Sequence, residues 1–293
     1  MTAQTKPPST DVQFSHVLVP LDGSDFGLAA MPTARALAER FNAELRTISV
    51  ASDEGRAGRL LAVGAAALGA DVGDGRADVV VGGDPAEVIA RHAEELGSCL
   101  VCLSTHGRGR FTGSVFGSVA RSVMQRSGSA IVALGPSADR PGWSPRPGWW
   151  PTSLSVSRIV ACVDGSEASE EVLPAASDWA RRLGMSLTIL TVVEDAPAPT
   201  RRHATRYGST GDAESYVEDL VRRWQETARD VNGLIIRDPI GPASGIRTYL
   251  AQQPAGLVAV RTHARSGLQR LLRGATAAGI VHASVAPCLV VPK

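Results

Sequence analysis

Lysine is almost absent from this sequence, and its scarcity excludes several classes of enzyme. The only lysines are Lys6 and Lys293, at the two ends of 293 residues. A P-loop needs a lysine that reaches the β- and γ-phosphates, a protein kinase needs one on a strand, and a pyridoxal phosphate enzyme needs one for its Schiff base. Arginine carries nearly all the positive charge here, and it cannot replace lysine as a nucleophilic amine. The folded body of this chain therefore has no lysine that could serve any of these three classes of enzyme.

The sequence also lacks an excess of positive or negative charge, and it lacks long apolar runs. The formal net charge is +1, which provides no electrostatic footprint for nucleic acid or an anionic membrane. No apolar run is long enough to span a bilayer, and the N-terminus has no apolar signal-peptide core. We therefore expect a cytoplasmic protein that binds neither nucleic acid nor membrane, with a flexible tail over residues 1–13.

Cysteine is scarce, with four in the chain, and two of them form a C-x-x-C pattern. Cys99 and Cys102 lie in an apolar run that is typical of a buried strand. Side chains three residues apart on a strand point to opposite faces, so the two thiols would diverge. We interpret both as small buried hydrophobic residues and not as a metal or redox pair.

The sequence contains an internal repeat. The segment 17–24, an apolar run that ends in Asp-Gly-Ser, matches 159–166, and a proline eight residues beyond each segment recurs as Pro32 and Pro174. A second match, Thr-His-Gly-Arg at 105–108 against Thr-His-Ala-Arg at 262–265, has an offset larger by fifteen residues. We assign those fifteen to a surface loop within 196–211.

The repeat divides the chain into two domains, 14–136 and 157–293. The linker between them, 137–156, is rich in proline and tryptophan, so its rings could bind a partner or pack back onto the domains. In each domain short apolar strands alternate with helices, which predicts an α/β fold with a parallel sheet covered on both faces. The strands are expected at 15–21, 44–50, 77–82, 99–104 and 130–134, then 157–163, 186–193, 233–238, 256–261 and 288–291. The helices are expected at 25–41, 56–69, 86–96 and 118–127, then 167–183, 212–230, 244–252 and 275–284.

Ligands of open α/β sheets bind beyond the carboxyl ends of the strands, where the strand order switches. Two segments of the first repeat follow such strand ends: Asp22-Gly-Ser24, and the glycine-rich stretch 104–118. Glycines allow the backbone to approach a phosphate, and the following helix offers free N–H groups that Ser118 could supplement or cap. Asp22 could hold a ribose hydroxyl or a metal ion, or it could only cap the turn. His106, which recurs as His263, is a candidate general base without an evident carboxylate partner.

On these residues the chain resembles the universal stress protein family in its tandem form. The family signature is Gly, two residues, Gly, nine residues, then Gly-Ser or Gly-Thr. The first repeat has this spacing, with Ser104 in place of the first glycine, followed by Gly107, Gly117 and Ser118. The resemblance covers nearly the whole chain twice.

The resemblance implies two tandem Rossmann-like domains of the adenine nucleotide alpha hydrolase kind, each a five-stranded parallel sheet of order 3-2-1-4-5. It also implies ATP or another adenine nucleotide as cofactor, and pairing of the domains through their last strands, with a homodimer possible. The metal is left unknown, and Mg²⁺ could accompany the nucleotide near Asp22. The implied nucleotide contacts in the first repeat are Pro20, Asp22, Val50, Leu103, Ser104, Gly107, Gly117, Ser118, Val119 and Ala120. Those in the second are Asp164, Val192, Arg261, Gly274 and Thr276.

The second repeat departs further from the signature. Arg261 replaces the first glycine, Ala264 the second, and Ala275 the hydroxyl residue, for which Thr276 could substitute. Arg261 could pair with phosphates or fill the pocket. We interpret this second site as degenerate.

Three functions remain open on the sequence. The first is a nucleotide-binding stress-response or regulatory protein without fast catalysis, since no nucleophile–base pair or metal cluster is evident. The second is a scaffold that has lost nucleotide binding, which the substitution at Ser104 keeps open. The third is a slow ATPase or a nucleotidyl-transfer enzyme on a related fold.

Overall fold

The computed structural model describes residues 13–106, 117–136, 158–194, 210–253, 255–261 and 275–291. The chain forms two compact units, which are described separately. The first unit comprises Gln13–Ser153 together with Pro287–Lys293, and the second comprises Leu154–Ala286. The predicted linker, the predicted fifteen-residue insertion and the N-terminal tail lie almost wholly outside the described residues.

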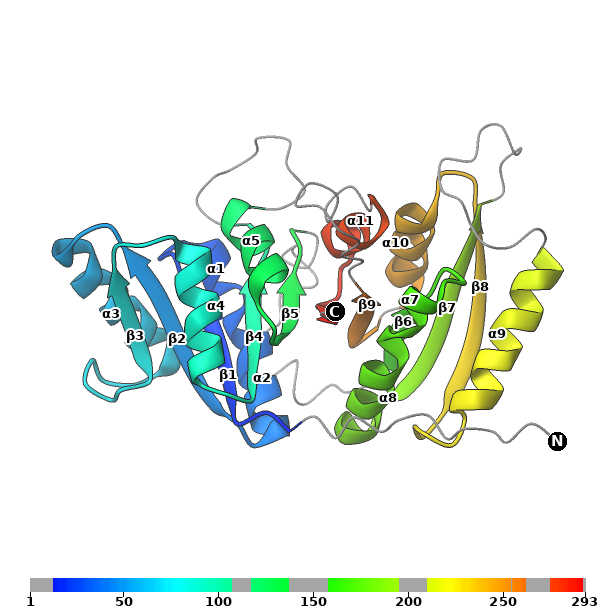
Figure 1. The fold of residues 1–293 in the computed structure, drawn as a ribbon, viewed down its shortest axis with the longest axis horizontal. Helices are drawn as coiled ribbons and strands as arrows, with labels where there is room; N and C mark the ends of the chain where they lie inside the picture. Colours follow the sequence, from blue (N-terminus) through cyan, green and yellow to red (C-terminus); the bar gives the residue numbers. More distant parts are fainter. Residues whose placement is uncertain are drawn as a thin grey trace. The chain divides into compact units, whose positions relative to one another are not determined.

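The first unit is built on a parallel sheet with strand order β3-β2-β1-β4-β5 (Figure 1). Its strands are β1 (His16–Pro20), β2 (Glu44–Ala51), β3 (Ala77–Val81), β4 (Cys99–Ser104) and β5 (Ala130–Leu134). The last strand of the chain, β10 (Cys288–Val291), pairs antiparallel with β5, with Cys288 opposite Ala133. The predicted α/β fold and strand order are confirmed.

The helices of the first unit are α1 (Asp25–Leu28), α2 (Met31–Phe41), α3 (Glu54–Leu68), α4 (Pro85–Glu95) and α5 (Ser118–Arg126). Helices α3 and α4 cover opposite faces of the sheet. Gly64 of α3 lies against Thr47, whereas His92 of α4 lies near Asp78, which pairs with Arg46. Neighbouring residues of a strand point to opposite faces, so Arg46 and Thr47 mark the two sides.

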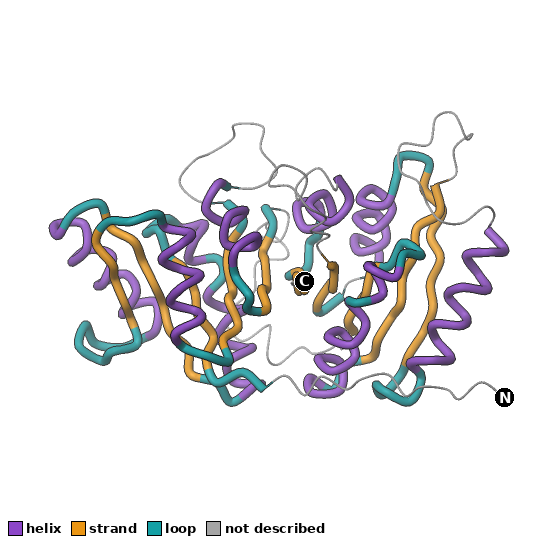
Figure 2. The backbone as a smooth tube through the Cα atoms, viewed as in Figure 1, coloured by secondary structure: helices purple, strands orange, loops and turns teal. Residues whose placement is uncertain are grey.

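The second unit has the same order in its four strands, β8-β7-β6-β9. These strands are β6 (Arg158–Cys162), β7 (Ser186–Glu194), β8 (Val231–Asp238) and β9 (Leu257–Arg261). Its helices are α7 (Glu167–Glu170), α8 (Val172–Leu183), α9 (Thr210–Trp224), α10 (Pro242–Gln252) and α11 (Ala275–Ala283), drawn in purple in Figure 2. Alternation of strand and helix thus recurs in both units, as the repeat predicts.

The first helix of each repeat is broken, where the sequence predicted a single helix. In the first unit α1 ends at Leu28 and α2 begins at Met31, and Pro32 is in the first turn of α2. Proline has no N–H to donate to Leu28 and its ring crowds that carbonyl, so the helix cannot run through unbroken. Pro174 stands in the first turn of α8 in the same way.

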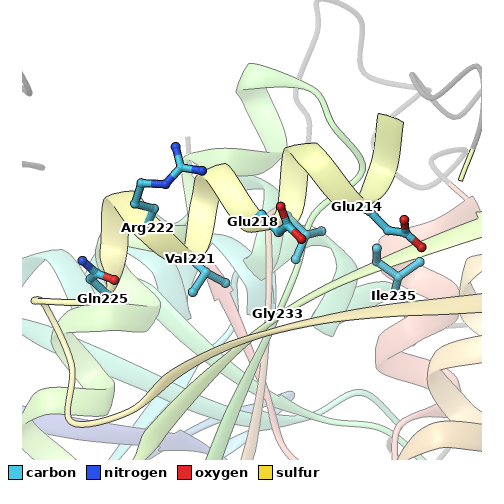
Figure 3. Close-up of a pocket in the computed structure, with 8 residues that line it drawn as sticks. Glu214, Glu218, Val221, Arg222, Gln225, Gly233 and Ile235 are labelled. Atoms are coloured by element: carbon cyan, nitrogen blue, oxygen red, sulfur yellow. The ribbon is translucent and has the colours of Figure 1, made fainter. Parts of the chain in front are cut away.

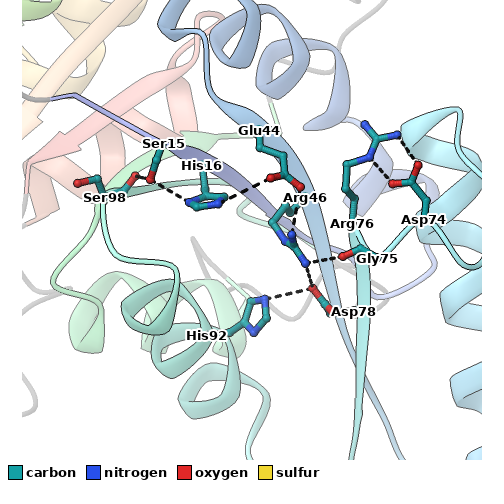
Figure 4. A network of polar contacts seen from close by, with 10 residues as sticks. All are labelled: Ser15, His16, Glu44, Arg46, Asp74, Gly75, Arg76, Asp78, His92 and Ser98. Carbon is teal, nitrogen blue, oxygen red and sulfur yellow. Dashed lines mark hydrogen bonds and ion pairs between the residues drawn. The ribbon is translucent and has the colours of Figure 1, made fainter.

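A half-buried cluster of charged residues lies at the amino ends of the strands of the first unit (Figure 4). Arg46 donates to Glu44 and to Asp78, each at 3.1 Å, and His92 Nε2 lies 3.3 Å from Asp78 Oδ2. His16 Nε2 lies 3.9 Å from Glu44. These ion pairs lie at the edge opposite to the carboxyl ends, so we interpret the cluster as structural.

Candidate functional site

The carboxyl ends of β1, β2 and β4 meet at one edge of the first unit, with β1 between the other two. The chain leaves β1 toward β2 and later crosses back to β4, which makes this edge the topological switch point. Pro20 ends β1, Val50 is next to last in β2, and Leu103 and Ser104 end β4. The fold therefore brings these four predicted contacts to one edge.

Asp22 fixes the turn that follows β1. Its Oδ1 accepts hydrogen bonds from the N–H of Ser24 at 2.9 Å and from the Ser24 hydroxyl at 2.5 Å. The Ser24 hydroxyl in turn accepts from the N–H of Gly27 at 3.2 Å and so caps α1. Gly23 has φ +78°, a conformation that favours glycine. Asp22 therefore holds the turn, one of its two predicted roles, and its carboxylate stands at the switch point.

The end of β4 is joined closely to the start of α5. The N–H of Gly117 donates to the carbonyl of Thr105 at 2.8 Å, and a Cβ at position 117 would lie 3.2 Å from that oxygen. Thr105 is fully buried, and both its N–H and its hydroxyl donate to the carbonyl of Leu134. The buried anchor Thr105 was not among the predicted site residues. Glycine at 117 lets the helix begin close to the strand end.

Helix α5 begins without a side-chain cap. Gly117 is the N-cap and makes no side-chain hydrogen bond, and Ser118, Val119 and Ala120 are the first three helical residues. Ser118 is therefore inside the helix, and its hydroxyl is not the cap that the sequence suggested. The first N–H groups of a helix have no partner within the helix and carry a partial positive charge, which suits an anion.

Several predicted residues cannot be placed. Gly107 and the remainder of the glycine-rich loop, residues 107–116, lie outside the described residues, and so does Gly274. Thr276 falls within α11, but its side chain is not described.

The Asp-Gly-Ser turn recurs in the second unit with one difference. Asp164 Oδ1 accepts from the Ser166 N–H at 3.0 Å and from the Ser166 hydroxyl at 2.5 Å. In place of Gly27 this unit has Ser169, whose hydroxyl accepts from the Asp164 N–H at 3.1 Å. Ser169 is buried, and its side chain adds a hydroxyl beside the turn where the first unit has only the closely packed Gly27.

Arg261 ends β9 at the position corresponding to Ser104. Its guanidinium forms an ion pair with Glu171, at the junction of α7 and α8. The Arg261 side chain is only 10% exposed, whereas Glu171 is 55% exposed. Arg261 therefore lies inside the unit against a carboxylate, and Val192, the other predicted contact that is described here, is buried. Of the two predicted roles of Arg261, the geometry favours filling the pocket.

The other candidate groups do not form a catalytic arrangement in the described residues. His106 Nδ1 lies 3.0 Å from the Thr105 hydroxyl. Cys99 and Cys102 are both buried free cysteines. Burial raises the pKa of the Cys99 thiol to about 12, and it also raises the pKa of Cys102. Among the described residues no three His, Cys, Asp or Glu side chains gather as a metal site would require.

A shallow cavity of about 520 Å³ lies elsewhere, between α9 and the edge strand β8 of the second unit (Figure 3). Its floor includes Gly233 and Ile235, and Glu214, Glu218 and Arg222 line its rim. Two strands separate β8 from β9, so this cavity is not the site at the strand ends. No helix in the described part of the chain is long and apolar enough to cross a membrane.

The fold and the switch-point geometry define the class: a doubly wound α/β protein built from a tandem repeat. The family model for the universal stress protein family matches residues 13–133 and 155–292, and the chain belongs to that family. Universal stress protein Rv2005c of Mycobacterium tuberculosis and its counterpart Mb2028c of Mycobacterium bovis are each 25% identical to it over 191 residues. That alignment covers 65% of this chain and 61% of the relatives' length.

Solved structures agree on the fold. The crystal structure of a universal stress protein from Archaeoglobus fulgidus DSM 4304 has a TM-score of 0.64 and 18% identity, covering 95% of this chain and 98% of that protein. Protein PA1789 from Pseudomonas aeruginosa PAO1, of unknown function, has a TM-score of 0.60 and 16% identity, covering 97% and 95%.

Proposed function

We propose that the first unit binds an adenine nucleotide, ATP, and that the protein is a cytoplasmic stress-response or regulatory protein. The observation that carries the proposal is the uncapped start of α5 at the switch point, beside the Asp22 turn. Free N–H groups at the start of a helix attract phosphates, and the carboxylate on the neighbouring strand end suits a ribose hydroxyl. Family membership supports the same assignment.

Different residues of the first unit contact different parts of the nucleotide. The main chain of Val50 meets the adenine, Asp22 and Pro20 meet the ribose, and Leu103 and Ser104 lie beneath the sugar. Gly117, Ser118, Val119 and Ala120 meet the phosphates through their N–H groups, with Gly107 in the loop before them. Asp22 is a single carboxylate, so a Mg²⁺ ion fits here only as the partner of the phosphates and not as a resident metal.

We propose one nucleotide per chain. In the second unit the Arg261–Glu171 ion pair holds a long side chain at the position of Ser104, Ser169 adds a hydroxyl beside the turn, and Val192 is buried. A long side chain held by an internal ion pair would have to be displaced before a nucleotide could enter. Asp164, Gly274 and Thr276 therefore represent a degenerate site. The pairing of β10 with β5 joins the last strands of the two repeats, as we propose for the tandem family form.

Matched substitutions in the two repeats test this proposal. Asp22→Ala and Asp164→Ala remove the same turn-forming hydrogen bonds, so their effects on folding should be similar. Calorimetric titration of the wild type with ATP should give about one site per chain. Asp22→Ala should weaken binding about 10- to 100-fold through the lost charged contact, and Asp164→Ala should leave it unchanged. Gly117→Glu, which places a carboxylate where the phosphates would bind, should abolish it.

Failure of the wild type to bind ATP would overturn the proposal, as would equal loss in the two alanine variants. A phosphate-release assay on the same wild-type sample separates a binder from a slow hydrolase. We expect no turnover above that of the Gly117→Glu variant.

A further inference from the structure

Arg56 has no partner for its charge. Its Nε is buried without a hydrogen bond, and no ion pair reaches its guanidinium from any residue of the described chain. The Nε atoms of Arg46, Arg121 and Arg158 are also buried without a hydrogen bond, but each of those arginines has another interaction, so Arg56 differs in having no partner for its guanidinium among the described residues.

The place of Arg56 on α3 directs it toward the ligand edge. The helix packs on the sheet through Leu60, Gly64 and Leu68, which are spaced four residues apart. Arg56 precedes Leu60 by four residues, so it lies on the same face one turn earlier. Helix α3 follows the carboxyl end of β2, and Val50 is next to last in that strand. The stripe that contacts the sheet therefore ends in an arginine over the carboxyl ends of the strands.

Helix electrostatics do not account for an arginine at this position. Asp53 is the N-cap of α3, and its side chain accepts from the Arg56 N–H at 2.8 Å. Arg56 is thus in the first turn, where the partial positive charge of the helix disfavours a cation. A residue that breaks a local rule without a structural gain indicates a functional position.

Among the described residues of the second unit, no arginine stands at the corresponding place on α9. The stripe of α9 that contacts its sheet begins with Ala213 and continues with Val217, both buried. The unit whose pocket is filled by Arg261 therefore has a small apolar residue where the first unit has Arg56. The arginine is therefore found in the unit that we propose binds the nucleotide.

We propose that the Arg56 guanidinium stacks on the purine base of the bound nucleotide. This inference rests on the proposed function. Phosphates held at the start of α5 lie beyond the end of β4. Strand β1 separates β4 from β2, and α3 follows β2. The end of the nucleotide that reaches α3 is therefore the end opposite to the phosphates, which is the base. The flat guanidinium stacks well on aromatic rings, and no ion pair within the described chain competes with a purine for it.

A ligand series with matched variants tests the inference. Arg56→Ala should weaken ATP, AMP and adenosine by the same factor, roughly 5- to 30-fold, because the base is common to all three. Arg59→Ala is the control, since Arg59 lies on the same helix with its side chain exposed and should bind like the wild type. The thermal midpoint of ligand-free Arg56→Ala should equal or exceed that of the wild type, whereas a structural role would lower it.

Two outcomes would overturn the inference. Unchanged affinity in Arg56→Ala would show that the side chain does not touch the ligand, while the proposed function would stand on wild-type binding. A loss that grows from adenosine to AMP to ATP would place Arg56 on the phosphates. Absence of ATP binding in the wild type would instead defeat the proposed function itself.

Discussion

At the scale of single residues, the two repeats differ by what fills the space beside the same turn. Asp22 and Asp164 make the same pair of hydrogen bonds to the serine two residues on. Gly27 packs closely on the turn in the first unit, since a Cβ there would lie 3.0 Å from Asp22 Oδ1, whereas in the second unit the Ser169 hydroxyl bonds to the turn. The same turn therefore has a glycine packed against it in one repeat and a serine bonded to it in the other.

The buried cysteines give a prediction at this scale. Iodoacetamide at pH 8 should leave Cys99 and Cys102 unmodified, because burial raises both pKa values and only the thiolate reacts. The half-exposed Cys162 serves as the internal control in the same peptide map. Rapid labelling of Cys99 in the folded protein would contradict the buried assignment, and denaturant should expose all three.

Some residue-level features could be predicted from the sequence and others could not. The strand-end positions of Pro20, Val50 and Ser104 followed from the apolar runs and the repeat. The partner of Arg261 did not, because Glu171 is distant in the chain and only the fold brings the two together. The anchoring role of Thr105 was missed for the same reason, because its burial and its hydrogen bonds to Leu134 are properties of the folded chain.

At the scale of elements, Gly64 shows why a poor helix former can stand in the middle of α3. A Cβ at this position would lie 2.7 Å from Thr47 Oγ1 and 3.3 Å from Ala77 Cβ. The glycine lets α3 approach β2 and β3 closely. Its low helix propensity made the helix uncertain from the sequence, yet α3 covers Glu54–Leu68.

Substitution of this glycine is therefore expected to destabilise the protein. Gly64→Val should lower the free energy of unfolding by about 1–3 kcal/mol through overpacking, measured by urea denaturation. Gly58→Ala, on the same helix with open space around it, should raise it by roughly 0.5–1 kcal/mol. If both variants raised the free energy of unfolding, helix propensity and not close packing would decide the effect.

The boundaries of most elements were predictable because parallel strands buried on both faces read as unbroken apolar runs. The division into α1 and α2 was not predicted, although the proline that causes it was recognised. The sequence places Pro32 within a helical pattern but does not say whether the helix bends or stops. Residues 225–230 were expected in a helix, but α9 ends at Trp224 and β8 begins at Val231.

At the scale of the whole molecule, the pairing of β10 with β5 decides how the first unit is completed. The exposed edge of a sheet is a template for pairing with other chains, and β10 covers the edge of β5. Leu289 and Val290 of β10 are almost fully buried, so the strand also contributes to the core.

Removal of residues 288–293 should therefore uncover this edge. We expect a lower thermal midpoint and concentration-dependent self-association, detected by light scattering during size-exclusion chromatography. Removal of 292–293 alone, which leaves β10 whole, should change neither property. A monomeric, fully stable truncation would show that β10 is dispensable for the first unit.

The same strand also affects how the protein is made. Residues 135–287 intervene between β5 and β10, so a ribosome synthesises the edge of the first sheet long before the strand that covers it. Closing so long a stretch of chain is entropically slow, and an uncovered strand edge is prone to aggregate in the meantime. The β5 edge of the nascent first unit therefore stays uncovered until β10 has been synthesised. Chaperone demand should accordingly peak during the second half of synthesis.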